Sequence, residues 1–362
     1  MTIDRLCLRN FLMFTGCKTD DFSKYQQDMV CESRANGLDE YEIDGPFDSF
    51  DEKFIDGINF FIGANATGKT SILKCIYAAC EFSNQVDTPN KARKIQNYFS
   101  SSRRPVKEIS QEENDCVELI RVFGGGKEFH FRLRDGFLGL GEWLELGIKS
   151  VFIPTTEMLS HSKGLIAMSL KWDIPFDATQ TDILVNAQLP ETNEITDRSK
   201  EILSMISATI GGEVIYDNDT FYLVKADGLK VEFSMEAQGF RRLGLLWKLI
   251  RNGLLERGSV LLWDEPEASI NPELMPLLVD MLYKLKSEGV QIFLASHSYL
   301  LAKYIDIKKQ SEDDVLFISL YKNEAGEIRT ARASSYTLLD RNPIETAEEH
   351  LFNAVITKSM GG

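Results

Sequence analysis

The pattern of hydrophobic and polar positions divides the chain into short strands and helices. Residues 3–11 alternate between apolar and polar, which is typical of a half-buried strand. Largely apolar runs indicate buried strands, and these stand at residues 60–62, 150–154, 260–263 and 291–296. Further strands are expected at 116–123, 128–133, 213–215, 221–225 and 230–233, and helices at 71–79 and 199–210.

A glycine-containing stretch joins the apolar run at residues 60–62 to the helical pattern at 71–79. It consists of Gly63, Ala64, Asn65, Ala66, Thr67, Gly68, Lys69 and Thr70 and is followed by Ser71. A buried strand, a tight turn and a helix in this order predict a P-loop. The backbone N–H groups would hold the phosphates of ATP, Lys69 would neutralise the β- and γ-phosphates, and the Thr70 hydroxyl would coordinate Mg²⁺.

Two further apolar strands end in residues suited to phosphate chemistry. The strand at 260–263 ends in Asp264 and Glu265, and the strand at 291–296 is followed by His297. Ligands of open α/β folds bind at the carboxyl ends of such strands. We expect Asp264 to hold Mg²⁺ through its hydration shell, and Glu265 to position and polarise an attacking water. His297 is expected to sense the γ-phosphate; the alternative is a purely structural histidine.

Composition and charge narrow the class of protein. The chain has 362 residues, of which 43% are hydrophobic and 26% charged, as in ordinary globular proteins. Its six cysteines stand at no metal-ligand spacing, and no run of about 18 apolar residues occurs. We therefore expect a cytoplasmic protein without membrane contact. The net charge of −15 argues against a protein that coats nucleic acid, although nucleic-acid contact at a local basic groove over residues 91–107 stays open.

Polar segments and glycines suggest how the chain is divided. Residues 25–53 are acidic and predict a surface insertion, residues 85–114 predict a loop, and three glycines at 124–126 predict a hairpin turn. Sustained heptads are absent, so no long coiled-coil arm is expected. We expect a first lobe over 1–154, a second lobe over 155–255 and a return to the first lobe over 256–362.

Three motifs taken together resemble those of ABC-type ATPases of the RecF/SMC/OLD group. They are Glu-Ala-Gln-Gly-Phe-Arg-Arg-Leu at 236–243, Trp-Asp-Glu-Pro-Glu-Ala-Ser-Ile-Asn-Pro at 263–272 and Ala-Ser-His-Ser at 295–298. They are similar to the signature, the Walker B motif with D-loop and the H-loop of OLD-like ATP-binding proteins that lack a Toprim nuclease domain. The resemblance implies an α/β P-loop NTPase fold: an ABC-type ATPase head with a mixed-sheet lobe and a smaller helical/β lobe.

The resemblance also implies a homodimer in which two chains sandwich two ATP molecules. Gly239 would then let the backbone approach the γ-phosphate bound by the other chain, Arg241 or its neighbour Arg242 would add charge, and Asn271 would touch the other head. This sequence departs from the family at two points. Ala237 stands where the signature usually has serine, with Ser234 as a substitute, and the Q-loop glutamine is not obvious near residues 151–159.

The biological role implied by the resemblance is an ATP-dependent switch or scaffold. Its ATP hydrolysis, slow or dependent on a partner, would control a separate effector, a nuclease or toxin encoded nearby, in bacterial anti-phage defence. The alternative is a RecF-like repair ATPase that binds DNA directly, and a transporter subunit is a weaker third reading. The trigger, and any oligomer larger than a dimer, stay open.

Overall fold

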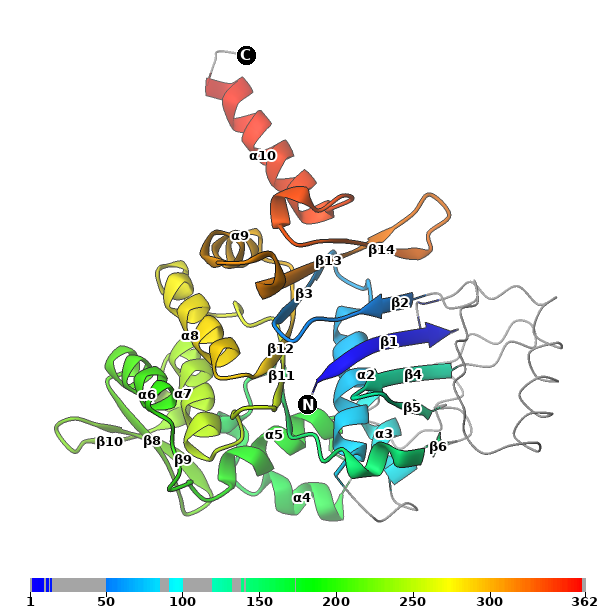
Figure 1. Ribbon diagram of the computed structural model, residues 1–362. Coiled ribbons are helices and arrows are strands. Elements are labelled where there is room, and N and C mark those ends of the chain that lie inside the picture. The colour runs from blue at the N-terminus through cyan, green and yellow to red at the C-terminus, as the bar shows by residue number, and fades with distance from the viewer. Residues whose placement is uncertain are drawn as a thin grey trace, which may run out of the picture.

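A six-stranded mixed sheet forms the centre of the molecule (Figure 1). The computed structural model describes residues 2–9, 11–12, 14, 50–84, 91–99, 119–131, 138–139, 141–172 and 174–359. The central sheet has the order β14-β13-β3-β12-β11-β7, and only β14 runs antiparallel to its neighbour. Its strands are β3 (Ile58–Gly63), β7 (Ser150–Ile153), β11 (Val260–Asp264), β12 (Gln291–Ser296), β13 (Val315–Lys322) and β14 (Ile328–Ala333).

Strand β3 lies in the middle of this sheet, between β12 and β13. Phe60 is opposite Leu294 of β12 on one side and Phe317 of β13 on the other. All six residues of β3 are buried, as expected for a parallel strand covered on both faces. Phe60 and Phe61 point to opposite faces and join different hydrophobic clusters.

A second, antiparallel sheet packs over helix α2 on one face of the central sheet (Figure 1). Its order is β2-β1-β4-β5-β6, with β1 (Ile3–Arg9), β2 (Phe50–Lys53), β4 (Leu119–Gly124), β5 (Lys127–Phe131) and β6 (Leu138–Gly139). The expected hairpin turn is present: β4 and β5 are joined through Gly125 and Gly126, whose φ angles are 58° and 74°. The side chain of Gln291 ties the two sheets together, because it exchanges hydrogen bonds with the backbone of Ile3 and donates another to Ile55.

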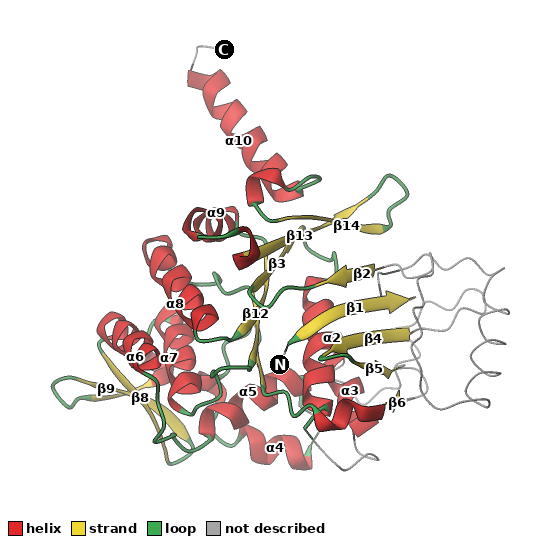
Figure 2. Ribbon diagram, in the orientation of Figure 1, coloured by secondary structure: helices red, strands yellow, loops and turns green. Residues whose placement is uncertain are grey.

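Helices cover both faces of the central sheet (Figure 2). They are α2 (Lys69–Phe82), α3 (Lys91–Phe99), α4 (Leu165–Lys171), α5 (Ala178–Gln188), α6 (Asp197–Ile210), α7 (Gln238–Arg251), α8 (Met275–Ser287), α9 (Tyr299–Lys308) and α10 (Pro343–Ser359). The prediction of a loop over residues 85–114 is wrong at Lys91–Phe99, which form helix α3. Ile95 and Tyr98, three positions apart, are both buried, and the Tyr98 ring packs on Tyr77 at 5.3 Å.

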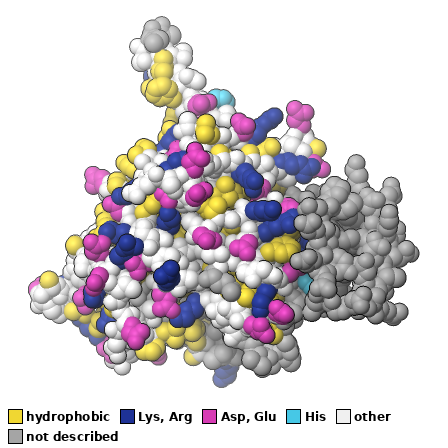
Figure 3. All heavy atoms as spheres, viewed as in Figure 1, with side chains coloured by type: hydrophobic (Ala, Val, Ile, Leu, Met, Phe, Trp, Pro, Cys, Tyr) yellow, Lys and Arg dark blue, Asp and Glu magenta, His cyan; other side chains and the backbone are white. Residues whose placement is uncertain are grey.

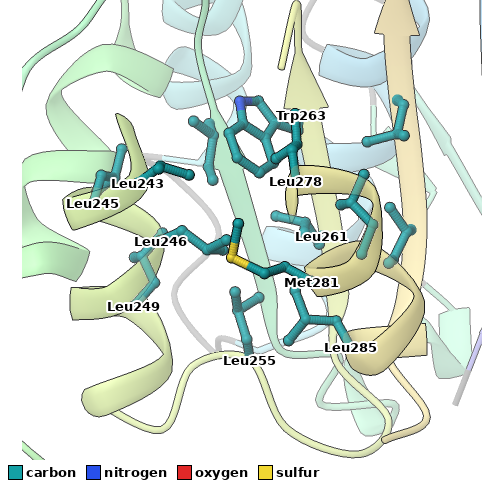
Figure 4. Packing of buried hydrophobic residues seen from close by; sticks show 14 of the residues in the cluster. Leu243, Leu245, Leu246, Leu249, Leu255, Leu261, Trp263, Leu278, Met281 and Leu285 are labelled. Carbon is teal, nitrogen blue, oxygen red and sulfur yellow. The ribbon is translucent and has the colours of Figure 1, made fainter. Parts of the chain in front are cut away.

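The smaller helical and β lobe holds α4 to α7 and a three-stranded antiparallel sheet. That sheet has the order β10-β9-β8, with β8 (Gly212–Asp217), β9 (Thr220–Lys225) and β10 (Lys230–Glu232). Helix α7 joins this lobe to the central sheet. Its leucines, Leu243 and Leu246 among them, pack beside Trp263 of β11 and Met281 of α8 (Figure 4). The start of α7 is thereby held beside the end of β11.

The last helix, α10, projects from the body of the molecule (Figure 1). None of its residues is buried. In the described part of the chain no helix is long and apolar enough to cross a membrane. The acidic segment up to residue 49 and the basic residues Arg103, Arg104 and Lys107 lie outside the described residues.

Candidate functional site

The loop between β3 and α2 leaves the first turn of a helix open to a ligand. Gly68 precedes α2 in a left-handed conformation with φ 95°, and Ala66 has φ 59°. No side chain caps α2, and no acidic residue lies in its first turn. Uncapped amides and the positive end of the helix dipole favour an anion. A Cβ on Gly63 would lie 2.4 Å from the carbonyl oxygen of Leu320, so the packing of β13 requires glycine there.

Lys69 places a cation inside this loop. Its Nζ donates to the carbonyl oxygens of Gly63 at 2.8 Å and Ala64 at 2.9 Å. Burial lowers the pKa of Lys69, while the carboxylates of Asp264 and Glu265 oppose that shift. Thr67 Oγ1 also donates to Ala64, at 2.8 Å, which fixes the turn. The loop therefore presents a buried ammonium group and the uncapped start of α2 to the same place, which suits the phosphates of ATP.

Asp264, at the end of β11, is bonded to two hydroxyl groups. Thr70 Oγ1 and Thr155 Oγ1 each donate to its Oδ2 at 2.9 Å. Burial raises the pKa of Asp264, and these two hydrogen bonds oppose the rise. The predicted metal residues Thr70 and Asp264 are thus brought together. Among the described residues no group of three or more His, Cys, Asp or Glu could hold a metal ion, so Mg²⁺ would need hydroxyl and phosphate oxygens beside this carboxylate.

Thr155 was not predicted from the sequence as a site residue. It follows β7, the strand beside β11, and stands in the segment where no Q-loop glutamine could be identified. Its partner Asp264 lies far along the chain. One feature of the sequence could have indicated Thr155: β7, like β11, is a short apolar strand that is followed by hydroxyl and acidic residues.

Glu265 and His297 lie together beside the end of β12. His297 Nδ1 is 3.1 Å from Glu265 Oε1. The Glu265 backbone has φ 49°, a left-handed conformation that non-glycine residues rarely adopt, and its N–H donates to Ala295 at 2.8 Å. The strained turn projects the carboxylate toward the histidine. A carboxylate next to an imidazole can accept a proton from water and share the resulting charge.

Glu267 is a third carboxylate at this edge that sequence reasoning did not single out. Its Oε1 accepts from Ser296 Oγ at 2.6 Å, and burial raises its pKa while that hydrogen bond opposes the rise. Its contact with Ser296 holds the D-loop turn against the end of β12. We therefore assign Glu267 to positioning His297, whose Nδ1 lies 4.0 Å away.

The signature segment contacts the same site through two arginines at the start of α7. Arg241 Nη1 lies 2.8 Å from Glu157 Oε2, and the Glu157 side chain is 4% exposed. Arg242 donates to the carbonyl oxygens of Glu265, at 3.0 Å, and of Thr155. The predicted contact of Arg241 with the nucleotide of another chain stays a prediction, and within this chain its partner is Glu157.

The other predicted signature residues have neighbours inside this chain. Gly239 is buried, and a Cβ there would lie 2.7 Å from the carbonyl oxygen of Ser269. Glycine therefore allows the start of α7 to approach the D-loop backbone closely. Asn271 accepts from the N–H of Glu273 at 3.1 Å and caps the short helix that follows it. Contacts of Gly239 and Asn271 with a second chain stay predictions. Ser234, the proposed substitute for the signature serine, donates to Glu232 at 2.7 Å.

A known protein family matches the part of the chain that carries Asp264, Glu265 and His297. Residues 170–303 match a family model described as an AAA domain, putative AbiEii toxin, of a type IV toxin–antitoxin system. This range contains Asp264, Glu265 and His297 but ends short of the P-loop on the N-terminal side. A search of curated protein sequences finds no match.

Solved structures similar to the chain are heads and cassettes of ATPases. An SMC head bound to the C-winged helix domain of ScpA has 14% identity and a TM-score of 0.47, with 93% of this chain and 99% of that chain covered. An SMC head domain from Thermotoga maritima has 14% identity and a TM-score of 0.40, with 91% and 98% covered. A nucleotide-free ATP-binding cassette of an ABC transporter has 13% identity and a TM-score of 0.41, with 92% of each chain covered.

The predicted fold class is confirmed. The mixed central sheet, the loop between β3 and α2, and the carboxylates of Asp264 and Glu265 at the end of β11 are arranged as in an α/β P-loop NTPase. The sheet lobe and the smaller helical and β lobe expected from the sequence are both present. The residue boundaries expected for the lobes stay predictions.

Proposed function

We propose that the protein binds Mg²⁺–ATP and hydrolyses it to ADP and phosphate. The observation that carries this proposal is the convergence, at the carboxyl ends of β3, β11 and β12, of Lys69, the Thr70–Asp264 pair and the Glu265–His297 pair. The segment after β3 supplies the phosphate-binding lysine and one metal residue. The end of β11 supplies the other metal residue and the carboxylate for water activation, and the end of β12 supplies the histidine.

Each residue has a defined task in the reaction. Lys69 and the backbone amides at the start of α2 hold the phosphate oxygens. Mg²⁺, held by Thr70 and Asp264, would neutralise the negative charge that develops on these phosphate oxygens. Glu265 orients a water toward the γ-phosphate and accepts its proton, while His297 fixes the carboxylate and stabilises the transferred charge. The strained backbone at Glu265 holds that carboxylate in position before the substrate arrives.

The test is nucleotide binding and phosphate release by the full chain. Lys69→Ala should remove detectable ATP binding, because the phosphates lose the one ammonium group that the loop buries beside them. Lys200→Ala is the matched control, since its side chain lies on α6, 63% exposed, and pairs only with Asp197 among the contacts described. ATP affinity of Lys69→Ala within a few-fold of that of the control would contradict the assignment.

The larger assembly is part of the same proposal. Two chains dimerise on ATP, with the start of α7 in one chain facing the P-loop of the other, and the closed dimer acts as a switch for a separate effector. The motifs at residues 236–243 and 263–272 support the OLD-like subgroup. The family description of a putative AbiEii toxin in a toxin–antitoxin system supports a partner protein and a role in anti-phage defence. Pull-down of the protein expressed with its gene neighbours, with and without Glu265→Gln, tests for that effector.

Direct DNA binding, as in a RecF-like repair ATPase, is less well supported. Tyr98 lies within the basic stretch at 91–107, but it is buried against Tyr77 and unavailable for stacking on bases. Salt-dependent DNA binding by the full chain would favour this alternative over the effector switch.

A further inference from the structure

Helix α10 carries an apolar stripe that none of the described residues covers. Leu351, Phe352 and Val355 are 61%, 66% and 57% exposed. Figure 3 shows hydrophobic side chains on the projecting helix. In proteins most helical stability comes from packing an apolar face. The described contacts of α10 give it no such packing beyond its first turn.

The base of α10 is fixed to the body, so that the stripe has a defined direction. Asn342 Oδ1 accepts from the N–H groups of Ile344 and Glu345, and Thr346 Oγ1 donates to the Asn342 carbonyl oxygen. Lys303 of α9 pairs with Glu345 at 3.4 Å. Ile344 packs against the larger hydrophobic cluster. The first turn is therefore an anchor, and the following turns are presented to solvent.

The exposed face follows the spacing of a coiled-coil seam. Glu348, Leu351, Val355 and Lys358 are separated by three, four and three residues, which places them on one face of the helix. The polar residues Thr346, Asn353 and Thr357 lie on the other side. Glu348 begins this face and Lys358 ends it, so that Leu351 and Val355 lie between an acid and a base.

We propose that α10 pairs with α10 of a second copy of this chain, antiparallel and centred on Asn353. In that arrangement Leu351 packs against Val355 of the second copy, and Glu348 meets Lys358 of the second copy. Both pairs occur twice because of the two-fold axis. Phe352 borders the seam near the axis and adds apolar area. The charge pattern thus complements itself only when the two helices run in opposite directions.

This interface is separate from the nucleotide sandwich and does not depend on it. Chains with a net charge of −15 repel each other in general, so association at α10 needs the local Glu–Lys match. One helix pair buries less than the roughly 1,000 Å² of a stable interface, and the contact alone is expected to be weak. In an ATP-closed dimer, two copies of α10 are held together and their effective concentration is raised. The α10 contacts would then join such dimers into larger assemblies.

The test is sedimentation of the full chain carrying Lys69→Ala, which removes ATP-driven association. Without nucleotide it should dimerise with a dissociation constant in the range of about 10 to 100 μM. Glu348→Lys and Lys358→Glu, each of which creates two like-charge layers, should weaken the dimer about tenfold. The double variant should restore it to within a few-fold. Glu349→Lys makes the same charge change outside the seam and should leave the dimer unchanged.

Three results would overturn the proposal, provided that circular dichroism shows folded proteins. One is a monomer at all concentrations up to about 1 mM, above any affinity that a specific helix pair needs. Another is a double variant as weak as the single ones, which would mean that Glu348 does not meet Lys358 of the second copy. The last is an equal effect of Glu349→Lys. None of these results bears on ATP binding, so a failure here leaves the proposed ATPase function intact.

Discussion

Replacing Thr155 by valine tests the hydroxyl that sequence reasoning missed. The change keeps the shape of the side chain and removes one of the two donors to Asp264 Oδ2, each at 2.9 Å. Asp264 is only 6% exposed, so water has little room to replace the lost donor. A hydrogen bond to a charged group is worth about 1.5 to 3 kcal/mol, and Thr70 still donates, so we expect a loss of about 1 to 2 kcal/mol of unfolding free energy.

The same deletion should weaken metal binding. Thr155 and Thr70 hold equivalent positions relative to Asp264, and each hydroxyl has a lone pair left to offer to a metal or to its bound water. Loss of about 1.4 kcal/mol of metal-binding free energy corresponds to about tenfold in affinity. Stability is measured by urea unfolding. Metal affinity is measured from the paramagnetic resonance of Mn²⁺ titrated into the protein with a non-hydrolysable ATP analogue.

The neighbouring residue provides the control. Thr156 is exposed, so Thr156→Val makes the same chemical change one position away without touching Asp264. If Thr155→Val unfolds at the same urea concentration as Thr156→Val and binds Mn²⁺ equally well, the hydroxyl contributes nothing to the carboxylate. A loss of stability with unchanged Mn²⁺ affinity would restrict Thr155 to a structural role.

Three further predictions follow from the site and the core. Glu265→Gln should still bind Mg²⁺–ATP but hydrolyse it about 10²-fold more slowly, because the amide accepts a proton poorly. Single-turnover phosphate release measures this rate, and an unchanged rate would exclude Glu265 as a general base. Co-expression of Lys69→Ala and Gly239→Asp chains should restore part of the ATPase activity that each variant lacks alone. If proven heterodimers show only the sum of the activities of the two separate variants, the site is completed within one chain. Burial raises the pKa of Asp314, but hydrogen bonds from Lys286 and two backbone N–H groups lower it overall to about 2. The lowered pKa stabilises the fold above the unfolded value near 3.8, and this stability is lost as the pH falls toward 2. Thermal melts between pH 5 and pH 2 should therefore show a smaller acid-induced drop for Asp314→Asn than for the parent, and equal drops would refute the role.

The sequence predicted the parts of the site that are local in the chain. Lys69 and Thr70 lie next to the strand that positions them, and Asp264 and Glu265 end their own strand, so periodicity and motif spacing were enough. Glu157 and the backbone contacts of Arg242 were not predictable, because their partners lie far away along the chain. Pairing across such distances depends on how α7 packs on β11, which no local pattern specifies.

Helix α3 was misjudged for a related reason. Its polar and basic composition favoured a loop, whereas the burial of Ile95 and Tyr98 on one side holds it as a helix against the body. The exposed face of α10 went unremarked because an apolar stripe in a terminal helix is normally assumed to pack on its own domain. Only the structure shows that α10 leaves the body after its first turn.

The central position of β3 has a consequence for synthesis on the ribosome. Its two neighbours in the sheet, β12 and β13, begin at Gln291 and Val315, long after Gly63 has been translated. At about 5 to 20 residues per second, the apolar residues of β3 wait about 10 to 50 s for their partners. During this time a largely apolar strand without neighbours favours aggregation. Because Gly63 lies against Leu320 of β13, the P-loop acquires its final shape only after β13 has been translated.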